Sequence, residues 1–151
     1  MTRPGVFVEL PTAMSAPPPS NLPDLRGLTL LVVDDDADAL EVLSTFLTAC
    51  SAHVLFARSA SGGLAYIDTA PRLDAVITDL SMPGMDGVEF VSKIRRHPLP
   101  SRRQIPVIAL TGFEENYLKT EAFDAYLRKP VDLDRLCSTI QSVITQRRGS
   151  D

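Results

Sequence analysis

Ala75-Val76-Ile77-Thr78-Asp79-Leu80-Ser81-Met82-Pro83-Gly84-Met85-Asp86-Gly87 is the stretch on which the interpretation of the whole sequence depends. Its apolar run ends in one carboxylate, Asp79, and a loop with a proline and two glycines follows. This pattern is typical of a buried strand followed by a tight turn. We therefore expect Asp79 at the carboxyl end of a strand, where open α/β sheets bind ligands. On this stretch alone, Asp79 could equally be a polar residue that only ends the strand.

Length and composition indicate one globular domain. The chain has 151 residues, of which 44% are hydrophobic, enough for one core and short for two. A formal net charge of −4 gives no indication of a nucleic-acid-binding surface. No apolar stretch reaches the length of a membrane span. Cys50 and Cys137 fall among apolar positions of helix-like segments, so we expect small core residues of a cytoplasmic protein rather than a disulfide or a metal pair.

The N-terminal segment differs in composition from the rest. Six of the 12 prolines fall within residues 1–24, which is too many for a regular element. Residues 1–26 are therefore predicted to be a flexible, Pro-rich arm, and residues 27–148 the folded domain.

Apolar runs predict five strands, at Leu28–Val33, His53–Ala57, Ala75–Thr78, Pro106–Leu110 and Ala125–Arg128. Segments with helical spacing follow them, at Asp36–Cys50, Ser59–Ala70, Asp86–His97, Phe113–Phe123 and Asp132–Arg147. In the third helix, Val88 is expected to face the core together with Phe90, Val91 and Ile94. The alternation predicts an α/β fold: a flavodoxin-like, doubly wound parallel (βα)5 sheet with strand order 2-1-3-4-5.

Chemically reactive side chains follow four of the predicted strands. Asp34 and Asp35 follow the first, Asp79 the third, Thr111 the fourth and Lys129 the fifth. In this strand order the first and third strands are neighbours, so the three carboxylates meet at one edge and repel one another unless a cation intervenes. An open cluster of oxygen ligands suits Mg²⁺. A carboxylate nucleophile, Mg²⁺, a lysine and a hydroxyl are together the parts needed for phosphoryl transfer onto an aspartate.

Four motifs at the ends of these strands resemble the receiver domain of two-component response regulators, the family typified by CheY. The motifs are Val32-Val33-Asp34-Asp35-Asp36, Asp79 with Met82-Pro83-Gly84-Met85-Asp86-Gly87, Ala109-Leu110-Thr111-Gly112, and Tyr126-Leu127-Arg128-Lys129-Pro130. The resemblance covers about Leu28 to Thr145, so the predicted domain at 27–148 is identified as a receiver domain.

The resemblance implies a role for each residue of the predicted site. Asp79 would be the phosphoacceptor, taking the phosphoryl group from a phosphohistidine on a histidine kinase or a histidine phosphotransfer protein. Asp35 and Asp79 would ligate Mg²⁺, with Asp34 helping directly or through water and Ser81 adding its backbone carbonyl. Lys129 would pair with the phosphoryl group and stabilise charge in the transition state.

The resemblance also implies a switch. Thr111 would hydrogen-bond the phosphoryl group and move toward it, and Tyr126 would turn inward behind it and change a protein-interaction surface. The domain would then signal to an unknown protein target, with no enzymatic activity beyond its own phosphorylation and dephosphorylation and no contact with nucleic acid or membrane. The family further implies a cis peptide between Lys129 and Pro130.

The sequence departs from the family in one place. Only residues 112–128 separate Thr111 from Lys129, roughly four residues or one helical turn fewer than usual. We therefore expect the fourth helix to be short or displaced. Beside the site, the small Ser81 and the apolar Phe113 predict slow self-dephosphorylation.

Three other interpretations were open. A haloacid-dehalogenase-like phosphatase would use residues 34–36 as its nucleophile pair, but it would want Thr or Val where Asp38 stands, and it leaves Asp79 unexplained. An EF-hand starting at the same stretch fails because loop positions 6 and 12 hold Ala39 and Thr45. The third alternative, a receiver-like interaction module that signals without phosphorylation, stays open.

Overall fold

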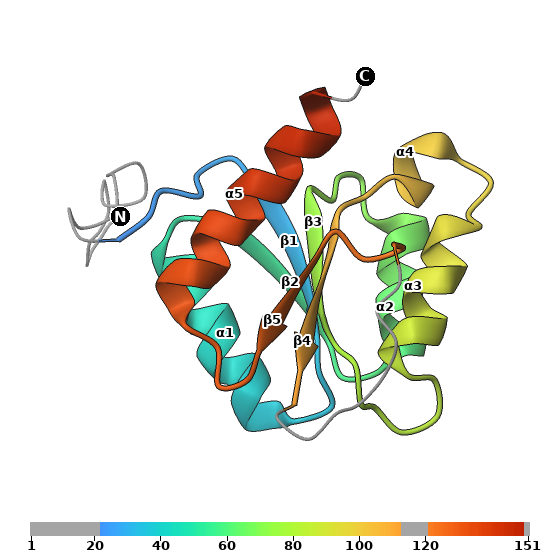
Figure 1. Ribbon diagram of the computed structural model, residues 1–151, viewed down its shortest axis with the longest axis horizontal. Coiled ribbons are helices and arrows are strands. Elements are labelled where there is room, and N and C mark those ends of the chain that lie inside the picture. The colour runs from blue at the N-terminus through green and yellow to red at the C-terminus, as the bar shows by residue number, and fades with distance from the viewer. Residues whose placement is uncertain (1–21, 113–120, 150–151) are drawn as a thin grey trace, which may run out of the picture.

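The computed structural model describes residues 22–112 and 121–149, so most of the predicted arm lies outside the described residues. Within this part, the elements in chain order are β1 Thr29–Val33, α1 Ala37–Ala49, β2 His53–Ala57, α2 Ala60–Thr69, β3 Ala75–Asp79, α3 Gly87–Arg95, α4 Pro100–Arg103, β4 Val107–Thr111, β5 Ala125–Arg128 and α5 Leu133–Gly149 (Figure 1). The strands form one parallel sheet in the order β2-β1-β3-β4-β5, which confirms the predicted fold. No helix in the described ranges is long and apolar enough to cross a bilayer.

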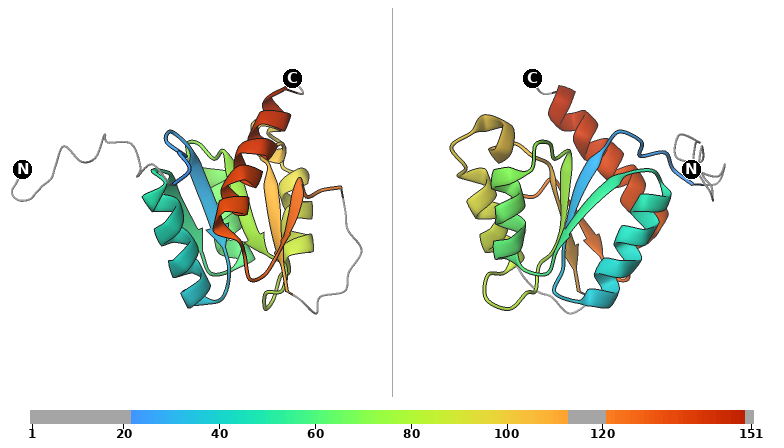
Figure 2. Two further views of the ribbon diagram at one scale, coloured as in Figure 1. Left: turned by 60° about the vertical axis from the view of Figure 1, so that its left-hand side comes forward. Right: turned by 180° about the vertical axis from the view of Figure 1, so that it is seen from behind.

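The sheet is covered on both faces. Figure 2 shows α1 and α5 on one face and α2 and α3 on the other. Alternate residues of each strand feed the two layers: in β1, Leu30 and Val32 pack toward α1 and α5, whereas Leu31 and Val33 pack toward α2 and α3. Because both layers exclude water, β3 and β4 are buried along their whole length, which explains their continuous apolar sequences.

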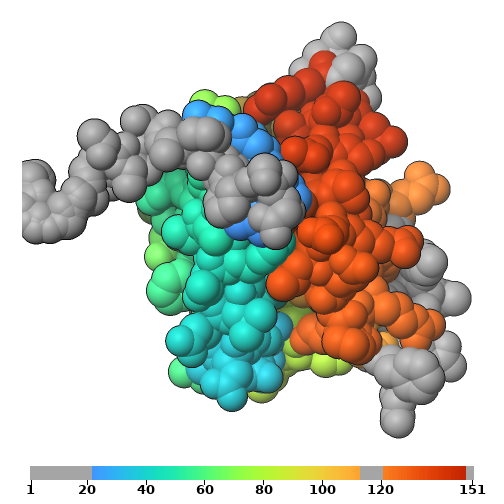
Figure 3. Space-filling model, turned by 90° about the vertical axis from the view of Figure 1, so that its left-hand side faces the viewer, coloured from blue at the N-terminus to red at the C-terminus, as the bar shows by residue number. Residues whose placement is uncertain are grey.

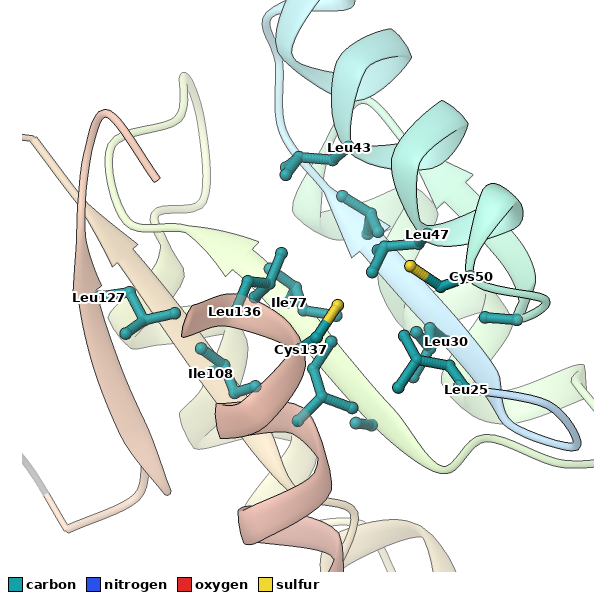
Figure 4. Packing of buried hydrophobic residues seen from close by; sticks show 14 of the residues in the cluster. Leu25, Leu30, Leu43, Leu47, Cys50, Ile77, Ile108, Leu127, Leu136 and Cys137 are labelled. Atoms are coloured by element: carbon teal, nitrogen blue, oxygen red, sulfur yellow. The ribbon is translucent and has the colours of Figure 1, made fainter. Parts of the chain in front are cut away.

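Cys50 and Cys137 lie, as predicted, in the core, in the layer between the sheet and helices α1 and α5 (Figure 4). In the space-filling view these two helices lie side by side and close over that layer (Figure 3). Both thiols are fully buried and free. Burial raises the pKa of Cys137 to about 12, so the thiol stays protonated and unreactive at neutral pH.

Polar side chains begin the helices that lead away from the sheet. Asp36 caps α1 by accepting from the Asp38 backbone N–H at 2.9 Å, and Asp86 caps α3 by accepting from the Glu89 N–H at 2.9 Å. Each cap satisfies a helix N–H that has no partner within the helix, and an alanine there costs about 1 kcal/mol.

Three local predictions need correction. Val88 is 39% exposed, because the buried face of α3 is defined by Phe90, Val91 and Ile94. A one-turn helix, α4, forms at Pro100–Arg103, where proline was interpreted only as a helix terminator; proline is favoured in a first turn. Residues 113–120 of the predicted fourth helix lie outside the described residues, and residues 121–124 form a turn.

The same hydrogen-bond pattern occurs twice at the N-terminal edge of the sheet. Just before β3, the Asp74 N–H donates to the Thr29 carbonyl at 2.8 Å, and the Asp74 carboxylate accepts from the Thr29 N–H at 2.8 Å. Just before β5, Asp124 makes the same reciprocal pair with Val107, at 2.8 and 2.9 Å. Each aspartate thus ties the starts of two neighbouring strands together.

Candidate functional site

Strand register brings the predicted site residues to one edge of the sheet. Asp34 follows β1, Asp79 ends β3, and Thr111 ends β4; β1 pairs with β3 and β3 with β4. Carboxylate oxygens of Asp34, Asp35 and Asp79 all lie within 4.8 Å of one another. Asp34 and Asp79 are buried and Asp35 is half-buried, so the cluster opens to solvent on one side.

Lys129 enters the cluster from the end of β5. Its Nζ lies 3.3 Å from Asp34 Oδ2 and 3.2 Å from Asp79 Oδ1. Burial lowers the pKa of Lys129, but the charges of Asp34 and Asp79 outweigh that effect and raise the pKa above its ordinary value. The ammonium is therefore firmly protonated and stands between the two carboxylates.

Asp79 is held in an unfavourable environment for an anion. Burial and the neighbouring Asp34 charge raise its pKa, and the attraction of Lys129 together with a hydrogen bond from the Ser81 N–H at 3.4 Å opposes this only in part. A carboxylate with a raised pKa in an open acidic cluster is a candidate functional residue.

Backbone contacts fix the loops that carry these side chains. The Lys129 N–H donates to the Thr111 carbonyl at 2.8 Å, and the Lys129–Pro130 peptide is cis, as predicted. After Asp79, the chain returns so closely that the Gly87 N–H donates to the Leu80 carbonyl at 2.9 Å. A Cβ at Gly87 would lie 2.6 Å from the Asp79 carbonyl oxygen, so only glycine fits there.

The donor set fits a hard divalent cation. Three carboxylates converge from two strand ends, and their oxygen atoms are the ligands that Mg²⁺ prefers. One lysine cannot neutralise three carboxylates, so the cluster retains negative charge with Lys129 in place.

Comparison with known proteins identifies the family to which this chain belongs. The family model of the response regulator receiver domain matches residues 30–141. The chain belongs to the response regulator receiver family. The match begins within β1, covers the other four strands and ends within α5.

The proteins similar to this chain are of different kinds. The chain is 33% identical over 149 residues to the sensor histidine kinase AtsR of Burkholderia thailandensis, covering 94% of this chain and 24% of that protein. It is 31% identical to the transcriptional regulatory protein FixJ of Bradyrhizobium diazoefficiens, covering 78% of this chain and 57% of that protein. The chain thus spans about a quarter and somewhat over half of the lengths of these two relatives. A receiver domain from Clostridium thermocellum superposes with a TM-score of 0.73 at 29% identity, covering 82% of this chain and 99% of that one.

Ser81 and Tyr126 lie near the edge but outside the acidic cluster. Ser81 is exposed, and the contact it makes with the site is its backbone N–H to Asp79. Tyr126 is half-buried on β5 beside Ala109, with its ring 5.3 Å from that of Phe123 at an interplanar angle of 64°. Their roles in the receiver remain predictions, as does that of Phe113, which lies outside the described residues.

Arg58 was missed by sequence reasoning. It follows β2 and donates from Nη2 to the Asp35 carbonyl at 3.2 Å, so it steadies the loop that carries two of the three carboxylates. The available signal was weak, because although Arg58 directly follows the strand that neighbours β1 in the predicted order, a single arginine after a strand has no distinctive spacing.

Proposed function

We propose that this receiver domain accepts a phosphoryl group on Asp79 in a Mg²⁺-dependent reaction and thereby switches a protein-interaction surface. The observation that carries the proposal is the convergence of Asp34, Asp35 and Asp79 within 4.8 Å, with the ammonium group of Lys129 beside them. Burial of a carboxylate among others is costly, so a cluster of this kind needs a bound cation or a changed charge.

In the transfer, an Asp79 carboxylate oxygen attacks the phosphorus of a phosphohistidine. The oxygen–phosphorus bond forms as the phosphorus–nitrogen bond breaks, and the donor imidazole leaves with the electron pair. Lys129 is positioned to pair with the phosphoryl oxygens, because its Nζ already lies 3.2 Å from Asp79 Oδ1. Thr111, at the end of the adjacent β4, would donate its hydroxyl to a phosphoryl oxygen.

Asp34, Asp35, Asp79 and the Ser81 carbonyl would hold Mg²⁺. When bound, the ion would neutralise charge on the transferring phosphoryl group and orient it toward Asp79.

Phosphorylation would replace the ion pair between Lys129 and Asp79 with contacts to the phosphoryl group. Thr111 would move toward that group, and Tyr126 would turn inward and change the surface around β4, β5 and α5. Because Tyr126 packs edge-to-face on Phe123, its rotation would also disturb the turn at residues 121–124.

The expected donor is a histidine kinase or a histidine phosphotransfer protein, and the target is a protein of unknown identity. The free thiols of Cys50 and Cys137 fit a reducing, cytoplasmic setting. The domain would be phosphorylated once per cycle and would act as acceptor rather than as an enzyme on other substrates. We propose residues 27–148 as the receiver unit; Leu25, just before it, is buried and donates its N–H to the Cys50 carbonyl.

Incubation with phosphoramidate and Mg²⁺, followed by intact-mass measurement, tests the proposal. The wild type is expected to gain one phosphoryl group, and the gain should disappear with EDTA or in Asp79→Asn. Asp74→Asn is the matched control, because it removes a buried carboxylate at the other end of β3 and should leave the gain unchanged. Absence of an adduct in the wild type, or an adduct that persists in Asp79→Asn, would favour the interaction module that signals without phosphorylation.

A further inference from the structure

A second cavity lies at the opposite edge of the sheet from Asp79. It has a volume of about 350 Å³ and lies between the starts of β3 and β4, α4 and the last turns of α5. In Figure 1, α4 and the end of α5 lie at the end of the sheet opposite the arrowheads of β4 and β5. Asp74 and Asp79 are five residues apart along β3, so the two sites are separated by about 16 Å.

The lining of this cavity, which we call the N-edge pocket, is apolar at depth and polar outside. Ile105 and Ile144 are buried and Leu73 is half-buried, whereas Gln104 and Arg148 are exposed. The volume of the N-edge pocket falls within the range of about 300–1,000 Å³ for small-molecule sites, and more of its accessible lining is polar than apolar.

Positive charge is in excess around the N-edge pocket. Four arginines pair with two aspartates: Arg72 and Arg148 with Asp74 at 3.1 and 3.0 Å, and Arg95 and Arg147 with Asp124 at 2.8 and 2.6 Å. The formal net charge of the whole chain is −4, so this local excess runs against the composition. The Asp74 carboxylate in the lining also accepts from the Thr29 N–H, so its charge is well compensated.

The two arginines that line the pocket keep donors for a further acceptor. Arg147 uses Nε and Nη2 on Asp124, and Arg148 uses Nη2 on Asp74. A guanidinium carries five N–H groups in a planar fork, which matches carboxylate and phosphate oxygens. A purely structural role for Arg148 would be to neutralise Asp74, but Arg72 and the Thr29 N–H already do so.

We propose that the N-edge pocket is a second ligand site that binds a small organic anion, with an apolar ring system against Ile105 and Ile144 and one oxyanion group against Arg147 and Arg148. The proposal goes beyond phosphorylation of Asp79 and does not depend on it. Because α5 supplies three of the lining residues, a bound anion would tie the end of α5 to the starts of β3 and β4.

Titration of the ¹⁵N-labelled chain with 2-naphthoate in Mg²⁺-free buffer, followed by amide chemical shifts, tests the proposal. Saturable shifts are expected at Gln104 and Ile144 and not at Asp79 or Thr111, with a Kd of about 1 mM or tighter for a ligand of this size. 2-Naphthol carries the ring without the charge, and acetate the charge without the ring. Each is expected to bind at least tenfold more weakly. 2-Naphthyl phosphate then distinguishes a preference for phosphate from one for carboxylate.

Arg148→Ala and Arg72→Ala form a matched pair. Both remove one partner of Asp74, and the two arginine side chains are similarly exposed, at 61% and 60%, but only Arg148 lines the pocket. Arg148→Ala is expected to weaken 2-naphthoate binding at least tenfold, and Arg72→Ala to leave it within twofold, at equal thermal stability. The proposal is overturned if 2-naphthoate causes no saturable shifts, if 2-naphthol binds equally well, or if the two variants weaken binding equally.

Discussion

At the C-terminal edge of the sheet Asp34, Asp35 and Asp79 face one another, whereas at the N-terminal edge Asp74 and Asp124 each face two arginines. The two edges are built from the same residue type at the two ends of the same strands. At the N-terminal edge the carboxylates are fully compensated by backbone N–H groups and guanidinium groups. At the C-terminal edge Lys129 serves two carboxylates, and burial raises the pKa of Asp79.

This contrast separates stability from function within one sheet. A compensated carboxylate holds neighbouring strands together, and its oxygens are already occupied by donors. An uncompensated carboxylate costs folding free energy and is free to bind a cation or take a phosphoryl group. Removing a carboxylate at the two edges should therefore change stability in opposite directions, and the predictions below test this, starting with the largest expected effect.

Asp124→Asn should cause the largest loss of stability. The Asp124 side chain is 11% exposed and pairs with Arg95, whose side chain is 18% exposed, and with Arg147. The largely buried Arg95 side chain would lose its counter-ion, although it keeps bonds to the carbonyls of Ala122 and Ile105. We expect a loss of about 3 kcal/mol, measured as a lower midpoint of urea unfolding with an unchanged slope.

Asp74→Asn is the internal control for that prediction. Its partners Arg72 and Arg148 are more than half exposed, so water replaces the lost carboxylate. We expect a loss of about 1 kcal/mol. Equal losses in the two variants would mean that burial of the partner arginines does not control stability at this edge.

The residues of the C-terminal edge could be predicted from the sequence, but the ion pairs of the N-terminal edge could not. Apolar runs that end in Asp34 and Asp79 placed both residues at strand ends, and the strand order then brought them together. Ser81, Thr111 and Tyr126 were placed on the right elements by the same reasoning, although their roles remain predictions.

The ion pairs at the N-terminal edge were not predicted, for a physical reason. Arg95 lies 29 residues from Asp124, and Arg148 lies 74 residues from Asp74, so no local period connects them. Such ion pairs follow from tertiary packing, whereas strand ends follow from local hydrophobic patterns. The errors at Val88 and in α4 are of a different kind, because there the local pattern itself was ambiguous.

Gly87→Ala should be the most damaging small substitution at the C-terminal edge, because the backbone of residues 79–80 packs directly against Gly87. A Cβ there would lie 2.6 Å from the Asp79 carbonyl oxygen and 2.8 Å from Leu80 Cα, neither of which can move without shifting β3. We expect a loss of about 2 kcal/mol in urea unfolding. Gly62→Ala in α2 is the matched control, since its Cβ would meet side-chain atoms at 3.3 Å and alanine favours a helix; its effect should stay within about 0.5 kcal/mol.

Asp79→Asn should have a small effect of the opposite sign. Without Mg²⁺, the substitution removes one of three mutually repelling carboxylates while keeping the shape of the side chain. We expect a gain of roughly 1 kcal/mol at pH 7, measured by urea unfolding. A loss of stability instead would show that the ion pair with Lys129 outweighs the repulsion, and the contrast between the two edges would fail.

The dependence of that gain on pH follows from the raised pKa of Asp79. Between the ordinary pKa and the raised one, the folded wild type holds more protons than the unfolded chain, so its stability falls as pH rises through this window. The variant lacks the group, so its advantage should be absent below about pH 4, grow through the window and stay constant above it. Added Mg²⁺ should stabilise the wild type by mass action and the variant much less, which would reverse the order of the two proteins.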